Sequence, residues 1–366
     1  MTKVAQIWSR VQAVLFPHVQ RCLDSKLTEK QLRLIAILEI VRIEEHVPSG
    51  WQQRMGRRRK DRRAIARAFI AKAVYNVPET ELLVEMLRSQ PTLLAICGWQ
   101  HVGELPSLST FSRAFAEFAT ARLADRVHEA LVKEHVSEHL VGHISRDSTA
   151  ISAREKPLKK PPQPLKPKRR RGRPKKGEVV DKSDQPQKRL PRQINQEPQE
   201  ALAELPSACD VGMKRDAKGH QSAWIGYKAH FDVNDVGLPI TVVTTSASLH
   251  DSQVAIPMEK LTAERVTSLY SLMDAAYDAE LIRQCCRQLN HVPIIDSNGR
   301  GVGKKLFDPA TAQRFKERST AERAYSRFKD DFGGRQVRVR GHLKVHAHIM
   351  FGVLALFADQ LLQLVM

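Results

Sequence analysis

The stretch from residue 308 to residue 329, DPATAQRFKERSTAERAYSRFK, predicts a single helix with an acid inside a basic stripe. Asp308 is a favourable N-cap, and Pro309 stands at the first helical position, where its missing N–H costs no hydrogen bond. The glycines at 333 and 334 end the segment. These signals therefore predict one continuous helix that carries an acid in its middle.

That acid is Glu322. A helix has 3.6 residues per turn, so Glu322 shares one face with Phe315, Arg318 and Lys329. One interpretation is an exposed ion pair between Arg318 and Glu322, which contributes about 0.3 to 0.5 kcal/mol. The other is a carboxylate held beside two cations that face a phosphate. The stretch alone leaves both interpretations open.

The composition favours a polyanionic partner. The chain has 366 residues, a net charge of +19 and an isoelectric point near 9.9, and nucleic acid is the most common partner of such a protein. No apolar run reaches the length of a membrane span, and the N-terminus lacks the pattern of a secretory signal. Five scattered cysteines fit neither a disulfide framework nor a zinc site. We expect a cytoplasmic protein with two domains.

The positive charge is concentrated inside the chain. Residues 156–176 contain eleven Lys or Arg, six Pro and no acid. The wider segment 155–205 is poor in aromatic residues, and we expect it to be a disordered insertion. Within it, Arg171, Gly172, Arg173 and Pro174 match the core of an AT-hook, which lays an extended backbone in a narrow minor groove. A generic basic tether is the alternative.

Residues 1–139 predict an all-helical domain, with amphipathic periods at 6–16, 29–44, 63–73 and 79–87. A second basic cluster, Arg57, Arg58 and Arg59, is either a solvated helix entrance or a patch that contacts phosphates. The domain itself is either a packing module or a module for binding DNA ends and for dimerisation.

From residue 140 the pattern changes to strands. The order is a strand with Asp147, a hairpin at 224–245 that turns at 234–237, a strand that ends in Asp274, a helix, a strand and the helix with Glu322. A buried helix follows at the C-terminus, and its histidines at 342, 346 and 348 have an ordinary structural interpretation. The chain therefore predicts a mixed α/β domain over residues 140–366, interrupted by the basic insertion.

These motifs together resemble the bacterial insertion-sequence DDE transposases that carry a Y-R-E-K signature. The signature spacing falls on Phe315, Arg318, Glu322 and Lys329, with phenylalanine in place of the tyrosine. This change removes a hydroxyl but keeps a ring. The segments SRDSTAI around Asp147, SASLHDS, MDAAYDAELI and RVRGHLKVHAHIMFGVLALFADQL are also similar to the family, as is the helical N-terminal part.

The resemblance implies an RNase H-like fold in which the first and fourth strands are adjacent, so that Asp147 and Asp274 meet Glu322. It implies that these three are catalytic and bind two Mg²⁺ ions, with Mn²⁺ able to substitute. Arg318 and Lys329 would contact DNA, and Asp251 is a reserve candidate for the acidic set.

The implied function is binding of terminal inverted repeats, cleavage of a DNA strand and transfer to target DNA. We expect double-stranded DNA as partner, a homodimer or larger synaptic complex, no membrane, and a location in the bacterial cytoplasm at the nucleoid. Two alternatives stay open. One is an inactive or domesticated architectural DNA-binding protein, and the other is a nuclease of the same fold without strand transfer.

Overall fold

The computed structural model describes residues 27–48, 60–157, 188–215, 219–299, 303 and 306–365. The predicted helix at 6–16, the cluster Arg57, Arg58 and Arg59, and the motif Arg171, Gly172, Arg173 and Pro174 lie outside these residues.

The N-terminal region is helical, as predicted. Its first described helix begins with a capping box, because the Thr28 hydroxyl accepts from the backbone of Gln31 while the Gln31 side chain accepts from the Thr28 N–H. The elements of the region are α2 (Glu29–Val41), η2 (Ile43–His46), α3 (Arg62–Val74), α4 (Thr80–Ser89), α5 (Pro91–Cys97), η4 (Val102–Glu104), α6 (Leu108–Thr120) and α7 (Leu123–His135).

A mixed sheet follows. It contains β1 (Leu140–Ser152), β2 (Asp210–Arg215), β3 (Gln221–Asn234), β4 (Pro239–Ser246), β5 (Thr267–Met273) and β6 (Val292–Ile295). The core order is β4-β3-β1-β5-β6, in which β3 is antiparallel to β1 and β4, while β1, β5 and β6 are parallel. The predicted hairpin is confirmed, with Gly237 at a φ of 85° in its turn. This strand order is that of an RNase H-like domain. The β2 strand, which pairs with the first half of β3, was not predicted.

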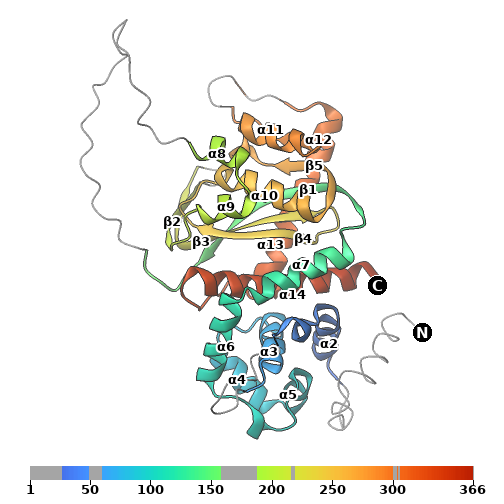
Figure 1. The fold of residues 1–366 in the computed structure, drawn as a ribbon, viewed down its shortest axis with the longest axis vertical. Helices are drawn as coiled ribbons and strands as arrows, with labels where there is room; N and C mark the ends of the chain where they lie inside the picture. The colour runs from blue at the N-terminus through green and yellow to red at the C-terminus, as the bar shows by residue number, and fades with distance from the viewer. Residues whose placement is uncertain are drawn as a thin grey trace, which may run out of the picture.

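Helices cover both faces of the sheet (Figure 1). Against one face lie α10 (Ser252–Arg265) and α11 (Glu280–Gln288), and against the other lies α13 (Ser319–Asp331). The short turn η5 (Ala275–Tyr277) follows β5 directly. On α13, Tyr325 and Phe328 place their rings 5.2 and 5.5 Å from that of Phe231, and this contact seats the helix on the sheet.

The stretch 308–329 is not one helix, which corrects the sequence-based prediction. Asp308 caps α12 (Pro309–Phe315) as expected, but a 3-10 turn, η6 (Lys316–Arg318), separates it from α13. The Ser145 hydroxyl on β1 donates to the Glu317 carbonyl at 3.3 Å and fixes this turn on the sheet. The change of helix type interrupts the regular spacing between Phe315 and Glu322, whereas Arg318 keeps its i, i+4 contact with Glu322.

The expectation of disorder over 155–205 is wrong at its C-terminal part. Residues 189–203 form α8 (Arg189–Asn195) and α9 (Pro198–Ala203). Both pack on α10, where the Lys260 ammonium donates to the carbonyls of Gln193, Ile194 and Gln196 at 3.0, 2.8 and 2.7 Å. The last carbonyls of a short helix have no partner within the helix, and here a lysine from a neighbouring helix satisfies them.

The helix α14 (His342–Val365) runs between the N-terminal helices and the sheet (Figure 1). It is long and apolar enough to cross a membrane, but most of it is buried inside the protein. Its Asp359 is 3% exposed and pairs with Arg33 of α2 and Arg327 of α13. One apolar core therefore joins α14 to both parts of the chain. The boundary between two domains at residue 139 stays a prediction.

The histidines of α14 have structural partners, as the sequence indicated. His342 contacts the Thr244 carbonyl, His346 lies between the Thr244 hydroxyl and Asp125, and His348 contacts the Gly333 carbonyl.

Candidate active site

Two of the predicted acids meet because of the strand register. The last paired residues of the parallel strands β1 and β5 are Arg146 and Met273, so Asp147 and Asp274 each follow by one residue at the same level. Successive side chains of a strand point to opposite faces. Asp147 therefore faces η6 and α13, whereas Arg146 faces α10. Neighbouring parallel strands are about 4.8 Å apart, which puts the two carboxylates side by side.

Both carboxylates are held by backbone amides. The Ser148 N–H donates to Asp147 Oδ1 at 2.7 Å, and the Ala276 N–H donates to Asp274 Oδ1 at 2.9 Å. Burial raises the pKa of Asp147 to about 6, and the charge of Asp274 adds to this rise. Burial also raises the pKa of Asp274, together with the charge of Asp251. Three acids thus concentrate negative charge at one end of the sheet, which favours a cation between them.

Arg318 is the cation that the structure places there. Its Nη1 lies 3.2 Å from Asp147 Oδ2, and its Nη2 lies 2.6 Å from Glu322 Oε1. The i, i+4 ion pair of the simpler interpretation is therefore present, but the same guanidinium also contacts Asp147. The bridge brings Glu322 to Asp147 through a guanidinium.

The donor set suits a hard divalent cation, because carboxylate oxygens are the ligands that Mg²⁺, Ca²⁺ and Mn²⁺ prefer. The hydroxyls of Tyr277 and Tyr325 support this fit. Both are buried and have no hydrogen-bond partner among the described residues, and burial, together with the charges of Asp147 and Asp251, raises the pKa of each. Buried hydroxyls of this kind are normally satisfied by a bound group or by water. Within the described ranges, no three His, Cys, Asp or Glu side chains converge closely enough to hold a metal as they stand.

The sequence did not single out either tyrosine. Tyr325 lies three residues after Glu322 and hence nearly on the same side of α13, which is a signal that helical spacing could have given. Tyr277 stands in the 3-10 turn directly after Asp274, where no periodicity applies.

Asp251 contributes charge to this acidic end but has its own cation. Its carboxylate, at the start of α10, pairs with the Lys228 ammonium at 2.9 Å. Against the effect of burial, the charges of His230 and Lys228 lower its pKa. We retain it as a reserve candidate.

Lys329 lies two turns of α13 beyond Glu322, about 10 Å along the axis. It is half-buried, and burial together with the charges of Arg335 and Lys214 lowers its pKa. These three basic residues form a positive surface next to the acidic site. Phe315 packs on Phe307 at 5.1 Å between ring centroids, so its ring has a packing role.

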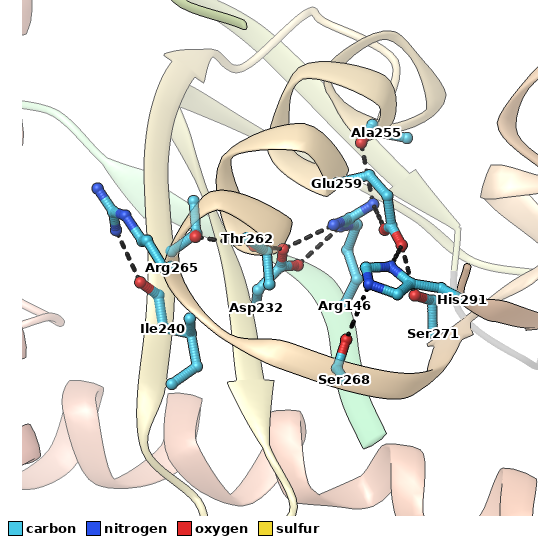
Figure 2. Close-up of polar contacts among 11 residues, drawn as sticks. Arg146, Asp232, Ile240, Ala255, Glu259, Thr262, Arg265, Ser268, Ser271 and His291 are labelled. Carbon is cyan, nitrogen blue, oxygen red and sulfur yellow. Dashed lines mark hydrogen bonds and ion pairs between the residues drawn. The ribbon is translucent and has the colours of Figure 1, made fainter. Parts of the chain in front are cut away.

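A buried polar network lies on the opposite face of β1 (Figure 2). The Arg146 guanidinium is fully buried and donates to both oxygens of Asp232, at 2.7 and 2.6 Å. It also contacts Glu259 at 2.8 Å, and Glu259 in turn contacts His291 at 2.8 Å. The network ties β1, β3 and α10 together directly behind Asp147, so it fixes the strand that carries this carboxylate.

Comparison with protein-family models agrees with this geometry. Residues 143–358 match the model described as Transposase DDE domain, and residues 21–117 match the one described as Transposase domain (DUF772). No curated protein gives a match. The first match spans more than half of the chain and contains Asp147, Asp274 and Glu322. The chain therefore belongs to the DDE transposase family, whose members are enzymes that act on DNA and generally use divalent metals.

Proposed function

We propose that this transposase binds the terminal inverted repeats of an insertion sequence, cleaves a strand at each end and joins the freed 3′ ends to target DNA. The observation that supports this most is the arrangement of Asp147 and Asp274 at one level on adjacent strands, with Glu322 linked to Asp147 through Arg318. Carboxylates gathered at one end of the sheet suit phosphodiester chemistry once a divalent ion draws them together.

Asp147, Asp274 and Glu322 would hold two Mg²⁺ ions, for which Mn²⁺ could substitute. When bound, such ions lower the pKa of the attacking group and neutralise charge on the phosphate. The Ser148 and Ala276 amides hold the two aspartates in place before substrate arrives, and this preorganisation lowers the cost of reaching the transition state.

The positive residues would place the DNA. Arg318 beside the acids and Lys329 farther along α13 are suited to orient the phosphate under attack. Arg57, Arg58 and Arg59, together with the minor-groove motif Arg171, Gly172, Arg173 and Pro174, would add contacts to the ends of the element. Synapsis of two ends calls for a homodimer or a larger assembly at the nucleoid.

The test uses a duplex with the terminal repeat of the element that encodes the chain, with Mg²⁺ present. We expect Asp147→Asn, Asp274→Asn and Glu322→Gln each to lower the cleavage rate by at least ~10³-fold. Their affinity for the duplex should stay within about threefold, because phosphate contacts dominate binding. Glu317→Gln, an exposed acid next to Arg318, is the matched control and should cleave normally.

Each alternative gives a different result in this assay. Wild-type cleavage without joining would indicate a nuclease, and binding without cleavage would indicate an architectural protein. Normal cleavage by any one of the three variants would exclude that residue from the catalytic set.

A further inference from the structure

Arg318 uses the carboxylate oxygens that a metal ion would need. Its two terminal nitrogens contact Asp147 Oδ2 and Glu322 Oε1, and the charge of Asp274 also acts on it. An oxygen that accepts a charge-assisted hydrogen bond from a guanidinium has to give it up before it can bind a divalent ion. The positive group and the metal therefore compete for the same place.

The surroundings of Arg318 allow it to leave. It ends the 3-10 turn between α12 and α13, a position at which helical hydrogen bonding changes pattern. Its guanidinium is 5.9 Å from the centre of the Phe315 ring, which provides a second surface for it. Glu322 is 56% exposed at its side chain, while Asp147 and Arg318 are each 20% exposed. Rotation of Arg318 toward solvent would thus open the acids without moving β1.

A DNA phosphate is the group best suited to take the guanidinium. Arginine binds phosphate through two parallel hydrogen bonds, as it binds carboxylate. We propose that Arg318 keeps the acidic site closed to divalent cations until a DNA phosphate draws the guanidinium away. This inference rests on the proposed function, because it assumes that Asp147 and Glu322 bind metal. By linkage, DNA and metal each strengthen the binding of the other.

The first experiment measures Mn²⁺ binding to the full chain without DNA, by titration calorimetry and by the electron paramagnetic resonance signal of free Mn²⁺. Arg318→Gln should bind Mn²⁺ at least about tenfold more tightly than the wild type. Arg323→Gln is the matched control. Arg323 lies next to Glu322, and its hydrogen bonds within the described part of the chain go to Ser319 and Thr320, so this variant removes a charge without opening the acids and should stay within about threefold.

The second experiment adds a 30-base-pair duplex. Wild-type Mn²⁺ affinity should rise at least about tenfold, while that of Arg318→Gln should change little because its site is already open. If Arg318→Gln fails to fold, Arg318→Lys replaces it. A lysine cannot bridge two carboxylates with a planar fork, so it should give a smaller gain of the same sign. Unchanged Mn²⁺ affinity in a folded variant, or an equal effect of DNA on wild type and variant, overturns the proposal.

Asp147→Asn separates this inference from the proposed function. If Asp147→Asn lowers Mn²⁺ affinity while Arg318→Gln leaves it unchanged, only the role of Arg318 is wrong. If the gain in Arg318→Gln persists when Asp147→Asn is added, the ion binds elsewhere, and both the inference and the assignment of Asp147 as a ligand fail.

Discussion

Two consecutive residues of β1 place their charges on opposite faces of the sheet. Asp147 carries its charge toward the face that holds η6 and α13, where the Arg318 guanidinium contacts it. Arg146 buries its charge completely between Asp232 and Glu259 (Figure 2). A buried ion is tolerated only when its partners compensate for the lost hydration, and here two carboxylates and the Ala255 carbonyl do so. The guanidinium is held so tightly that its pKa is raised further, chiefly by these carboxylates against the effect of burial.

Removal of the buried arginine should therefore be costly. We expect Arg146→Met to reduce the free energy of unfolding by about 3 to 5 kcal/mol, because it leaves two carboxylates buried without their cation. Urea unfolding followed by circular dichroism measures this loss. Arg323→Met, at an exposed position of α13, is the control and should lower the free energy of unfolding by under ~1 kcal/mol. A loss of that small size for Arg146→Met would mean that water reaches the network.

Among the helices and strands, the sequence predicts those whose ends are marked by a local pattern. The acid after β5 and the hairpin between β3 and β4 follow from apolar runs that end at an acid or at an Asn-to-Gly turn. These local patterns predict where the central strands begin and end. The RNase H-like order of the strands is implied by the family resemblance. The position of Asp147 beside Asp274 depends on that order and on no local signal.

Other elements depend on contacts distant in the sequence. The break at η6 is set by its contact with Ser145, which lies more than 170 residues earlier. The short helices α8 and α9 lie in a Pro-rich segment and are stabilised by α10. The strand β2 exists through its pairing with β3. Periodicity in a single sequence contains none of this information, so these elements were missed.

The helices α8 and α9 should depend on one lysine. We expect Lys260→Met to raise the rate of trypsin cleavage after Arg192 about tenfold, because three carbonyls lose their donor at a cost of about 1 to 2 kcal/mol. Mass spectrometry identifies the cut site. The melting temperature should change little, since the sheet does not rest on these helices. Lys316→Met, at an exposed position of η6, is the control, and equal cleavage in both variants would refute the role of Lys260.

At the scale of the whole molecule, α14 holds both parts of the chain together. Its apolar face packs on α2, α3, α6 and α7 on one side and on β4 and α13 on the other. Two buried histidines belong to these contacts. His128 of α7 packs edge-on against Phe357 and contacts the Pro239 carbonyl at 2.8 Å, and His348 contacts the Gly333 carbonyl at 3.0 Å.

These histidines should make the molecule sensitive to acid. Burial lowers the pKa of His128 to about 4 and that of His348 to about 3. Both are neutral in the folded protein at pH 5, whereas the unfolded chain protonates them below about pH 6.5. The unfolded state then binds more protons, so the stabilisation is complete above pH 6.5 and is lost as the pH falls toward the folded pKa. At pH 5, each histidine should lower the free energy of unfolding by about 2 kcal/mol.

Urea unfolding at pH 7.5 and at pH 5 tests this expectation. His128→Gln keeps a donor for the Pro239 carbonyl but removes the titrating group. Between pH 7.5 and pH 5, the free energy of unfolding of this variant should therefore fall less than that of the wild type. His101→Gln, at an exposed position, should behave as the wild type. The same pH dependence in wild type and His128→Gln would show that His128 is not the source.

The position of α14 in the chain also affects how the protein is made. A ribosome adds about 5 to 20 residues per second, so some 10 to 40 s separate the synthesis of α7 from that of α14. During this interval the emerging N-terminal helices have no partner for the face that α14 will cover. All three candidate catalytic acids are translated before this helix, and α13 lacks one of its supports until it arrives. We therefore expect the site of the nascent chain to become fully ordered only after α14 has been synthesised.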